Sequence, residues 1–456
     1  MPWSSSIHPP DRPFPLDNTH WGTHCGLSFH GMTSQSVYNR RAASVVGMAL
    51  LVIAAFSPIN AQTTAASNDR YLARAKRILR ETPLIDGHND LPWRIREDTI
   101  ARGNVDAYDL RTHRPGQTDL DRLRKGMIGA QFWSVYTPGE YRDSGYARVQ
   151  LEQIDIARRM IEKYPDRLAL ALNSADIRRD FKQGKLASLL GIEGGHAIEH
   201  SLGALRAYYD LGVRYMTLTH NVTLDWADAA LDSARHNGLT PFGDSVVREM
   251  NRLGMLVDLS HVSPATMSAA LNVSQAPVIF SHSAARALVD VPRNVPDSIL
   301  RRVTKNGGIV MVPFVTGFVS PAVYLYDQST RPPMRDLKQK YGNDTAAITR
   351  AVNEWRKTHP EPRATLSQVA DQIEYVRRVT GVDHVGIGGD FDGITEVVQG
   401  LEDVSTYPAL FAELARRGWS DSDLRKLAGE NFLRVFGQAE TVAKRMQKQI
   451  SAVNGR

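Results

Sequence analysis

The chain has 456 residues, of which 42% are hydrophobic and 23% are charged, values that are ordinary for a folded soluble protein. Its 55 basic and 49 acidic residues give a net charge of +6, but they are interspersed and form no block of lysine and arginine. This distribution argues against nucleic-acid binding and favours a solvated, mildly basic surface. The length is compatible with two or three domains, and also with a single α/β barrel.

Residues 1–61 are predicted to be a leader rather than part of the fold. Two arginines precede an apolar core at about 45–56, and small residues then lead to a plausible cleavage site after Ala61. Met32 would start a normal signal peptide, so we interpret 1–31 as an upstream extension that is not translated. The apolar core is shorter than the roughly 20 residues of a membrane span. The pattern therefore predicts export to the periplasm or the medium, with a retained N-terminal membrane anchor as the alternative.

The single cysteine, Cys25, lies inside this leader. The mature chain is therefore expected to contain no disulfide, no cysteine nucleophile and no thiolate ligand for a metal. Any dimer that it forms cannot be linked by a disulfide.

Eight short apolar runs alternate with helical stretches from position 83 onward. In chain order they are "PLIDGHND", "GMIGAQFWSVY", "ASLLGIEGG", "VRYMTLTH", "MLVDLSH", "PVIFSH", "GGIVMVPF" and "HVGIGGDFDG". Amphipathic helices are predicted between them, for example at 148–164, 243–254 and 366–381. Near-continuous apolar strands indicate a parallel sheet, and eight repeats predict a closed (β/α)8 barrel of the TIM type over 62–440. An open doubly wound sheet is the alternative, but no GxGxxG motif follows the first strand.

A polar segment at 315–365 interrupts this alternation after the seventh strand. Because long loops on this face of a barrel are usually functional, we predict a lid or a specificity insertion, with some helix in "DTAAITRAVNEWRKT". Residues 441–456 are expected to form a C-terminal tail.

Histidine, aspartate and glutamate stand at the ends of most predicted strands. They are His88 and Asp90 (strand one), Glu193 (three), His220 (four), His261 (five), His282 (six), and Asp390 and Asp392 (eight). A lone histidine in such a place is usually a hydrogen-bonded strand end. In a parallel barrel, however, all of these ends open at one mouth, where catalytic groups belong. The repetition therefore predicts one shared site.

Imidazole and carboxylate groups without thiolate favour zinc, with cobalt and manganese as alternatives. If five of these residues bind metal directly, they exceed what one tetrahedral ion with an open position needs. Two ions that share a carboxylate fit better. Glu193 is the natural bridge, because no lysine stands at a strand end; Lys185 precedes the third strand.

From about residue 70 to 437 the sequence resembles the membrane (renal) dipeptidase family of the amidohydrolase superfamily. The motifs that carry the resemblance occur in order and are "DGHNDLP", "GIEGGH", "TLTHN", "VDLSHVS", "VIFSHSAAR", "RNVPD", "GGDFDG", "GLEDVSTYPALFAELARRGW" and "ENFLRVF". The resemblance implies a zinc dipeptidase with two ions per chain. It implies that His88 and Asp90 bind one ion, that His261 and His282 bind the other, and that Glu193 bridges them.

The resemblance also implies roles for three further residues and a homodimeric assembly. His220 is expected to contact the substrate, Arg293 of "RNVPD" to bind its carboxylate, and Asp390 to transfer protons. One departure concerns a tyrosine that animal members place shortly after strand seven to contact the substrate. Counting forward from "RNVPD" leads to Phe318 here, which leaves the carboxylate contacts and the preferred dipeptide open.

Other residues near the strand ends are expected to support the site rather than to bind metal. We predict that His196 and His200 are not ligands, that Asp392 caps a turn or exchanges roles with Asp390, and that Asp86 orients a ligand histidine. The sequence is also compatible with two alternative functions. One is hydrolysis of N-acyl amino acids or lactams in the same site, and the other is an exported binding protein without catalysis.

Overall fold

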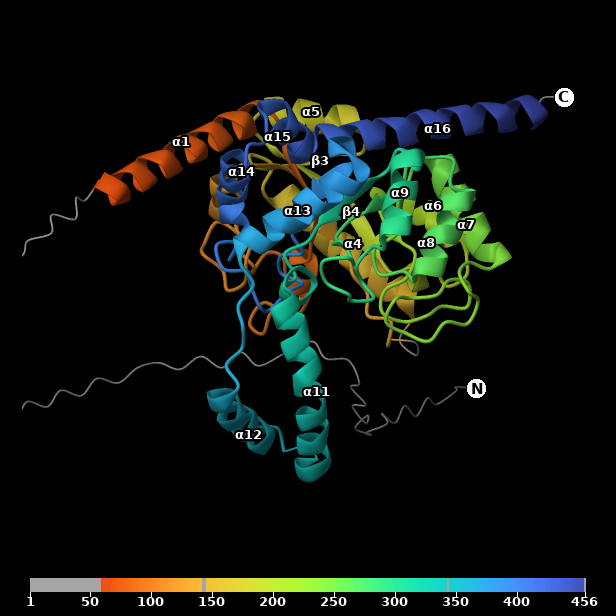
Figure 1. Ribbon diagram of the computed structural model, residues 1–456. Coiled ribbons are helices and arrows are strands. Elements are labelled where there is room, and N and C mark those ends of the chain that lie inside the picture. Colours follow the sequence, from red (N-terminus) through yellow and green to blue (C-terminus); the bar gives the residue numbers. More distant parts are fainter. Residues whose placement is uncertain (1–58, 142–144, 343, 455–456) are drawn as a thin grey trace, which may run out of the picture. The chain divides into compact units, whose positions relative to one another are not determined.

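The computed structural model describes residues 59–141, 145–342 and 344–454 (Figure 1). Eight of its nine strands close into a parallel barrel. These eight strands are β1 (Leu84–Asn89), β2 (Ile128–Ser134), β4 (Leu186–Glu193), β5 (Val213–Thr217), β6 (Leu256–Asp258), β7 (Ile279–Phe280), β8 (Ile309–Val312) and β9 (Val385–Ile387). The ring closes because β2 pairs with both β1 and β4, and β1 pairs with β9. Each of the eight predicted runs overlaps one of these strands, so the predicted (β/α)8 barrel is confirmed.

The ninth strand, β3 (Leu168–Leu170), was not predicted. It pairs in parallel with the first residues of β4, and β5 takes the same side of β4 further along the strand. Three residues are too few to show a period in the sequence, which is why the pattern did not reveal this strand.

The described chain also contains helices, most of which surround the barrel and cover its strands (Figure 1). They are α1 (Ile59–Glu81), α2 (Leu91–Arg96), α3 (Leu120–Lys125), α4 (Tyr146–Lys163), α5 (Ser174–Lys182), α6 (Leu202–Asp210), α7 (Pro241–Leu253), α8 (Pro264–Val273), α9 (Asp297–Asn306), α10 (Thr316–Val319), α11 (Pro321–Tyr341), α12 (Thr345–Thr358), α13 (Leu366–Thr380), α14 (Tyr407–Arg416), α15 (Asp421–Arg425) and α16 (Asn431–Asn454). The three amphipathic helices predicted from the sequence are α4, α7 and α13.

Helix α7 illustrates how local sequence sets these elements. Thr240 caps its N-terminus by accepting a hydrogen bond from the backbone N–H of Gly243, and Pro241 occupies the first turn, where a backbone donor is not needed. Gly254 ends the helix with a φ of 84°, a left-handed conformation that favours glycine. The apolar face of the helix is buried against the barrel.

The C-terminal helix α16 covers the end of the barrel at which the strands begin. Asn431 donates hydrogen bonds to the backbone oxygens of Val382 and Val385, at the start of β9. The ring of Phe432 packs edge-on against Phe132 of β2, with 5.4 Å between the ring centroids. This end of the barrel is closed by side chains, so the opposite end is left as the mouth. The helix continues without a break past residue 440, where the sequence predicted a tail.

The polar insertion at 315–365 is mostly helical. Helix α12 confirms the helix predicted in this segment, whereas α11 was not predicted. The two helices form an arm that extends from the barrel (Figure 1), and the rings of Tyr326 and Trp355 pack between them with 5.8 Å between centroids. The backbone oxygen of Phe318, at the base of the arm, accepts hydrogen bonds from Asn294 and Gln372.

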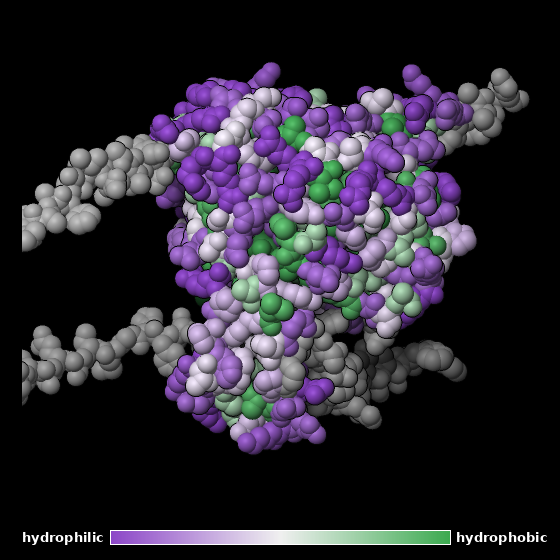
Figure 2. All heavy atoms as spheres, in the orientation of Figure 1, coloured by the Kyte–Doolittle hydropathy of each residue, from purple (hydrophilic) through white to green (hydrophobic). Residues whose placement is uncertain are grey.

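Figure 2 shows hydrophilic residues distributed over the visible face of the barrel and of the arm, as the interspersed charges predicted. Within the described part of the chain, every helix is too short or too polar to cross a lipid bilayer. The apolar core of the predicted leader, and Cys25, lie outside the described residues.

Close backbone approaches bring the strand ends together at the mouth. A Cβ atom on Gly388 would lie 1.8 Å from the backbone oxygen of Ser281, and one on Gly87 would lie 2.6 Å from the same oxygen. Only residues without a side chain fit between the ends of β1, β7 and β9, which is how the ligand-type residues that follow come within reach of one another.

Gly388→Ala is therefore expected to lower the free energy of unfolding by about 3 kcal/mol, because the added methyl group would overlap backbone that cannot turn aside. Urea denaturation followed by circular dichroism measures this change. Gly203→Ala, in the exposed first turn of α6, is the matched control and should be neutral or stabilising by about 0.5 kcal/mol. Unchanged stability of Gly388→Ala would contradict the close packing of these strand ends.

Candidate metal centre

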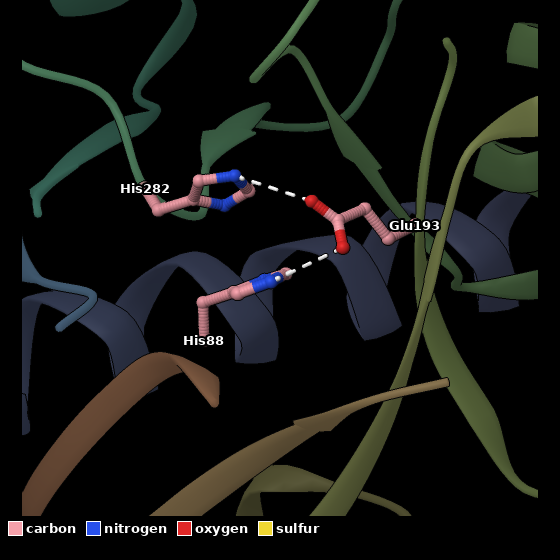
Figure 3. A group of neighbouring side chains, drawn as sticks. All are labelled: His88, Glu193 and His282. Carbon is pink, nitrogen blue, oxygen red and sulfur yellow. Dashed lines mark ion pairs between the residues drawn. The ribbon is translucent and has the colours of Figure 1, made fainter. Parts of the chain in front are cut away.

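The ends of six barrel strands deliver buried or largely buried imidazole and carboxylate groups to one point at the mouth. Glu193, the last residue of β4, lies between His88 of β1 and His282, which follows β7 (Figure 3). Glu193 Oε2 lies 3.4 Å from His88 Nε2, and Glu193 Oε1 lies 3.4 Å from His282 Nε2. The two oxygens of one carboxylate therefore face two different histidines.

On one side of Glu193, two further carboxylates approach His88. Its Nε2 lies 3.2 Å from Asp90 Oδ2 and 3.9 Å from Asp390 Oδ1. Potential ligand atoms of these three residues all lie within 4.8 Å of one another. They form the first of two candidate ligand groups that meet at Glu193.

On the other side, histidines gather around Glu193 Oε1. His261 Nε2 lies 3.0 Å from this oxygen, and His220 Nε2 lies 3.8 Å from it. The Nε2 atoms of His261 and His282 are only 2.9 Å apart. This is the second candidate ligand group.

Hydrogen bonds at Nδ1 show which ring nitrogens are free to bind a cation. His261 Nδ1 faces the amide oxygen of Asn221 at 3.0 Å, so this nitrogen carries the hydrogen. His88 Nδ1 faces the hydroxyl of Tyr215 at 2.8 Å, and that hydroxyl already donates to the backbone oxygen of Gly87. In both histidines, Nε2 is therefore left with a lone pair that points at the centre.

These bare nitrogens fit a bound cation. His88 Nε2 is buried and accepts no hydrogen bond from the described residues. The Nε2 atoms of His261 and His282 lie 2.9 Å apart, a separation that is favourable when a hydrogen or a bound cation lies between them. The donor set contains nitrogen and oxygen only, which suits zinc, cobalt or manganese.

Burial shifts the protonation of the residues predicted to handle the substrate. It raises the pKa of Asp390 well above that of an ordinary carboxyl group, and it lowers the pKa of His220 to about 4. Strongly shifted pKa values that gather at the mouth of a barrel are typical of active sites.

Three residues at the mouth of the barrel have a strained backbone. His261, Asp390 and Asp392 have φ values of 67°, 63° and 63°, in a region that residues with a side chain rarely adopt. Each such residue costs on the order of 1–3 kcal/mol and persists where the surroundings impose it. The backbone N–H of Asp390 donates to the backbone oxygen of His88 at 3.1 Å, which ties the ends of β9 and β1 together.

Asp86 supports this pair of strand ends, but not in the way that the sequence suggested. Its carboxylate accepts hydrogen bonds from the backbone N–H groups of His88 and Gly389 and from the hydroxyl of Tyr407. It therefore orients the ligand strand through its backbone and makes no hydrogen bond to an imidazole ring. Asp392 accepts from the backbone N–H of Gln117 at 2.8 Å, as expected of a residue that holds a turn.

His196 and His200 lie outside both ligand groups, as the sequence predicted. His196 Nε2 faces the backbone oxygen of Thr137 at 2.6 Å, and the exposed His200 pairs with Asp225 at 2.6 Å.

Arg293 is almost completely buried, with 2% of its surface exposed. Among the described residues, its Nη1 donates a 3.5 Å hydrogen bond to the hydroxyl of Ser283, and its guanidinium carbon lies 5.3 Å from the ring centroid of Phe318. Burial lowers its pKa to about 10. A buried guanidinium with so few acceptors is well suited to an anionic ligand.

Sequence reasoning missed several residues that touch the predicted ligands. Ser134 donates to Glu193 Oε2 at 3.1 Å, and Tyr215 and Asn221 hold the rings of His88 and His261. Ser134 ends the second strand, so the strand-end rule would have found it had hydroxyl groups been counted. Tyr215 gives no comparable signal, because it lies inside β5. Asn221 directly follows His220, but its amide is a residue type that the rule did not count.

The closed parallel barrel and the buried histidine–carboxylate centre at its mouth define a metal-dependent barrel enzyme. The sequence profile of membrane dipeptidase (peptidase family M19) matches residues 72–450, and the chain belongs to this family. Curated relatives include dipeptidase 3 of Mus musculus and of Rattus norvegicus. Each is 43% identical over 384 residues, which cover 83% of this chain and 69% or 70% of the relative.

Solved structures agree with this assignment. The probable dipeptidase PvdM from Pseudomonas aeruginosa is similar with a TM-score of 0.71 and 25% identity, over 82% of this chain and 100% of that chain. A metallopeptidase from Rhodobacter sphaeroides, at 24% identity and a TM-score of 0.64, shares the fold over 78% of this chain and 99% of that chain. The family resemblance is thus confirmed, and the chain is a metallopeptidase of the membrane dipeptidase family.

Proposed function

We propose that the protein is an exported zinc dipeptidase with two ions per chain, which hydrolyses the peptide bond of dipeptides that have a free C-terminal carboxylate. The observation that carries the proposal is that Glu193 divides its two oxygens between two buried ligand groups. A dipeptide as substrate follows from membership of the family.

In this proposal His88 and Asp90 hold one ion, His261 and His282 hold the other, and Glu193 binds both. Cobalt and manganese are the alternatives that the same donors allow. When bound, the two ions supply an activated water near neutral pH and polarise the scissile carbonyl group.

His220 and Asp390 then act on the substrate from opposite sides of Glu193. The neutral imidazole of His220 donates a hydrogen bond to the oxygen of the scissile carbonyl as negative charge develops there, which contributes about 3 kcal/mol in comparable sites. Asp390 accepts the proton of the attacking water and passes it to the departing amine. Its position supports this role, because Oδ1 lies 3.9 Å from His88 Nε2, within the first ligand group.

Arg293 binds the C-terminal carboxylate of the substrate in this proposal. A guanidinium group presents a rigid fork that matches a carboxylate, and this one is buried with few acceptors of its own. The ring of Phe318 lies against it and offers no hydroxyl, so Arg293 carries more of the carboxylate recognition.

Arg293→Lys is expected to raise KM about 30-fold or more for free dipeptides, because an ammonium group is a point charge that cannot form the paired hydrogen bonds. For dipeptides with an amidated C-terminus, which should be poor substrates already, the change should be under threefold. Steady-state kinetics with matched free and amidated substrates measure the difference. Equal losses on both substrates, together with a lower melting temperature, would show that Arg293 only supports its loop.

Hydrolysis of N-acyl amino acids or lactams is the alternative activity that the same centre could perform. Turnover of a panel that pairs each dipeptide with the N-acetylated form of its C-terminal residue separates the two. We expect dipeptides to have the higher kcat/KM throughout, and a consistent preference for the acylated amino acids would overturn the assignment of the substrate.

We also propose the domain layout and the assembly that the sequence predicted. The enzyme domain spans 62–440 and follows a cleaved leader of residues 1–61, and the mature enzyme is a homodimer without a disulfide. N-terminal sequencing of the exported protein and sedimentation of the purified enzyme test these statements.

A further inference from the structure

Asp258 is a fully buried carboxylate at the end of β6 that belongs to neither ligand group. It forms no ion pair with the described residues. Both oxygens accept hydrogen bonds instead. Oδ1 accepts from the backbone N–H groups of Ser281 (2.8 Å) and Ser260 (3.1 Å), and Oδ2 accepts from the hydroxyls of Ser281 and Thr217 (2.6 Å each). Nothing in the proposed reaction uses this group, although burying a carboxylate is costly.

The hydrogen bonds of Ser281 connect Asp258 to His282. A serine hydroxyl has one hydrogen, and Ser281 donates it to Asp258 Oδ2. Ser281 Oγ also lies 2.7 Å from His282 Nδ1, so it must accept there, and Nδ1 must carry the hydrogen of the ring. His282 Nε2 is then left with its lone pair, and it is this atom that faces Glu193 and His261.

Hydrogen bonds also connect the residues around Asp258 to Arg293. The hydroxyl of Ser260 accepts from the backbone N–H of His282 at 3.0 Å and from the hydroxyl of Ser283 at 3.2 Å, and Ser283 accepts from Arg293. The residues that end β6 and β7 are therefore held in one hydrogen-bonded network beneath the mouth, with Asp258 as its only charged acceptor.

We propose that Asp258 is a positioning residue that acts through Ser281 to hold the ring of His282 with Nε2 unprotonated and aimed at the metal centre. This inference rests on the proposed role of His282 as a metal ligand. A carboxylate that supports a ligand histidine typically changes metal affinity by about 10–100-fold, and here a serine hydroxyl relays the effect.

We call the hydrogen-bonded connection from Asp258 through Ser281 to the ring of His282 the relay. Two substitutions break it in different ways. Ser281→Ala removes the acceptor for His282 Nδ1 and leaves the carboxylate in place. Each oxygen of Asp258 accepts two hydrogen bonds. Asp258→Asn replaces one of these oxygens with an NH2 group, which donates, so the amide cannot accept from all four donors. Where the NH2 group faces Ser281, it reverses the direction of the relay and places the hydrogen of the ring on Nε2.

Thr217→Val is the matched control. Thr217 donates to the same oxygen of Asp258 at the same distance as Ser281, but the described contacts of Thr217 include none with His282. The control therefore disturbs the carboxylate and the packing without touching the relay. His282→Ala provides the reference for loss of the ligand itself.

The experiment titrates zinc into each metal-free protein against a chromophoric chelator and records the visible spectrum of the cobalt-loaded form. We expect Ser281→Ala and Asp258→Asn to bind one of the two ions about 10–100-fold more weakly than the wild type, with an altered cobalt spectrum, and Thr217→Val to stay within threefold.

Wild-type affinity for both ions in Ser281→Ala and Asp258→Asn would overturn the proposal, as would an equal loss in Thr217→Val, which would indicate a packing effect. Melting temperatures of the metal-free proteins show whether each variant is folded when it is titrated. If His282→Ala itself retained both ions at full affinity, His282 would not be a metal ligand, and the ligand set of the proposed function would be wrong. The two failures are therefore distinguishable.

Discussion

Glu193→Gln is expected to abolish the binding of two ions and to lower dipeptide turnover by about a thousandfold or more, equivalent to roughly 4 kcal/mol in the activation free energy. Among the described residues, this carboxylate alone reaches both ligand groups with its two oxygens, at 3.4 Å from His88 Nε2 and 3.0 Å from His261 Nε2. An amide offers one oxygen, which is a weaker ligand than a carboxylate oxygen, and one NH2 group. The hydrogens of the NH2 group carry partial positive charge and would face a metal ion unfavourably.

Elemental analysis after dialysis, combined with kcat on the best dipeptide, measures both effects. Glu199→Gln is the control, since Glu199 lies on the loop that follows the same strand but accepts a hydrogen bond from the exposed backbone N–H of Ala147 and lies outside both ligand groups. Glu199→Gln should keep both ions and full activity. Two bound ions and wild-type turnover in Glu193→Gln would remove Glu193 from the centre.

Asp390→Asn is expected to retain both ions and to lose turnover by about a thousandfold, within the range that a general acid–base group contributes. The amide keeps the size and the polar contacts of the side chain but cannot accept and release a proton. Because the substitution removes a step of the reaction rather than a binding contact, kcat should fall while KM changes little.

Asp392→Asn is the matched comparison. Asp392 lies two residues further on, has the same left-handed backbone, and accepts a hydrogen bond from the backbone of Gln117. We expect its substitution to affect stability more than kcat. An active Asp390→Asn together with an inactive Asp392→Asn would reverse the roles of the two carboxylates.

The barrel was predictable because its strands are buried on both faces and appear in the sequence as apolar runs. The same fact made the ligand-type residues visible: His88, Glu193 and His282 each stand where an apolar run ends. The topology of a parallel barrel then requires these ends to meet, and the structure places potential ligand atoms of all three within 4.8 Å of one another.

The supporting residues were not predictable in the same way. Asp258 ends one strand and reaches the ring of His282 through Ser281, which follows another strand, so no spacing along the chain reveals the connection. Helix α11 was missed for another reason: its prolines weaken the local helix signal, which the long segment and its packing against α12 override.

The contact between Phe318 and Arg293 was predictable only in part. Counting along the sequence identified Phe318 as the residue in place of a tyrosine, but only the structure shows its ring against the guanidinium group. Position was readable from the sequence, whereas the nature of the contact was not.

Stepwise return of zinc to the metal-free enzyme tests the central claim most directly, with bound zinc and dipeptide turnover measured on the same samples. The proposal predicts that chelation abolishes turnover without unfolding the chain, and that activity rises to its plateau only as the second equivalent of zinc per chain is bound. Full activity at one equivalent, or turnover that persists in the metal-free enzyme, would contradict it.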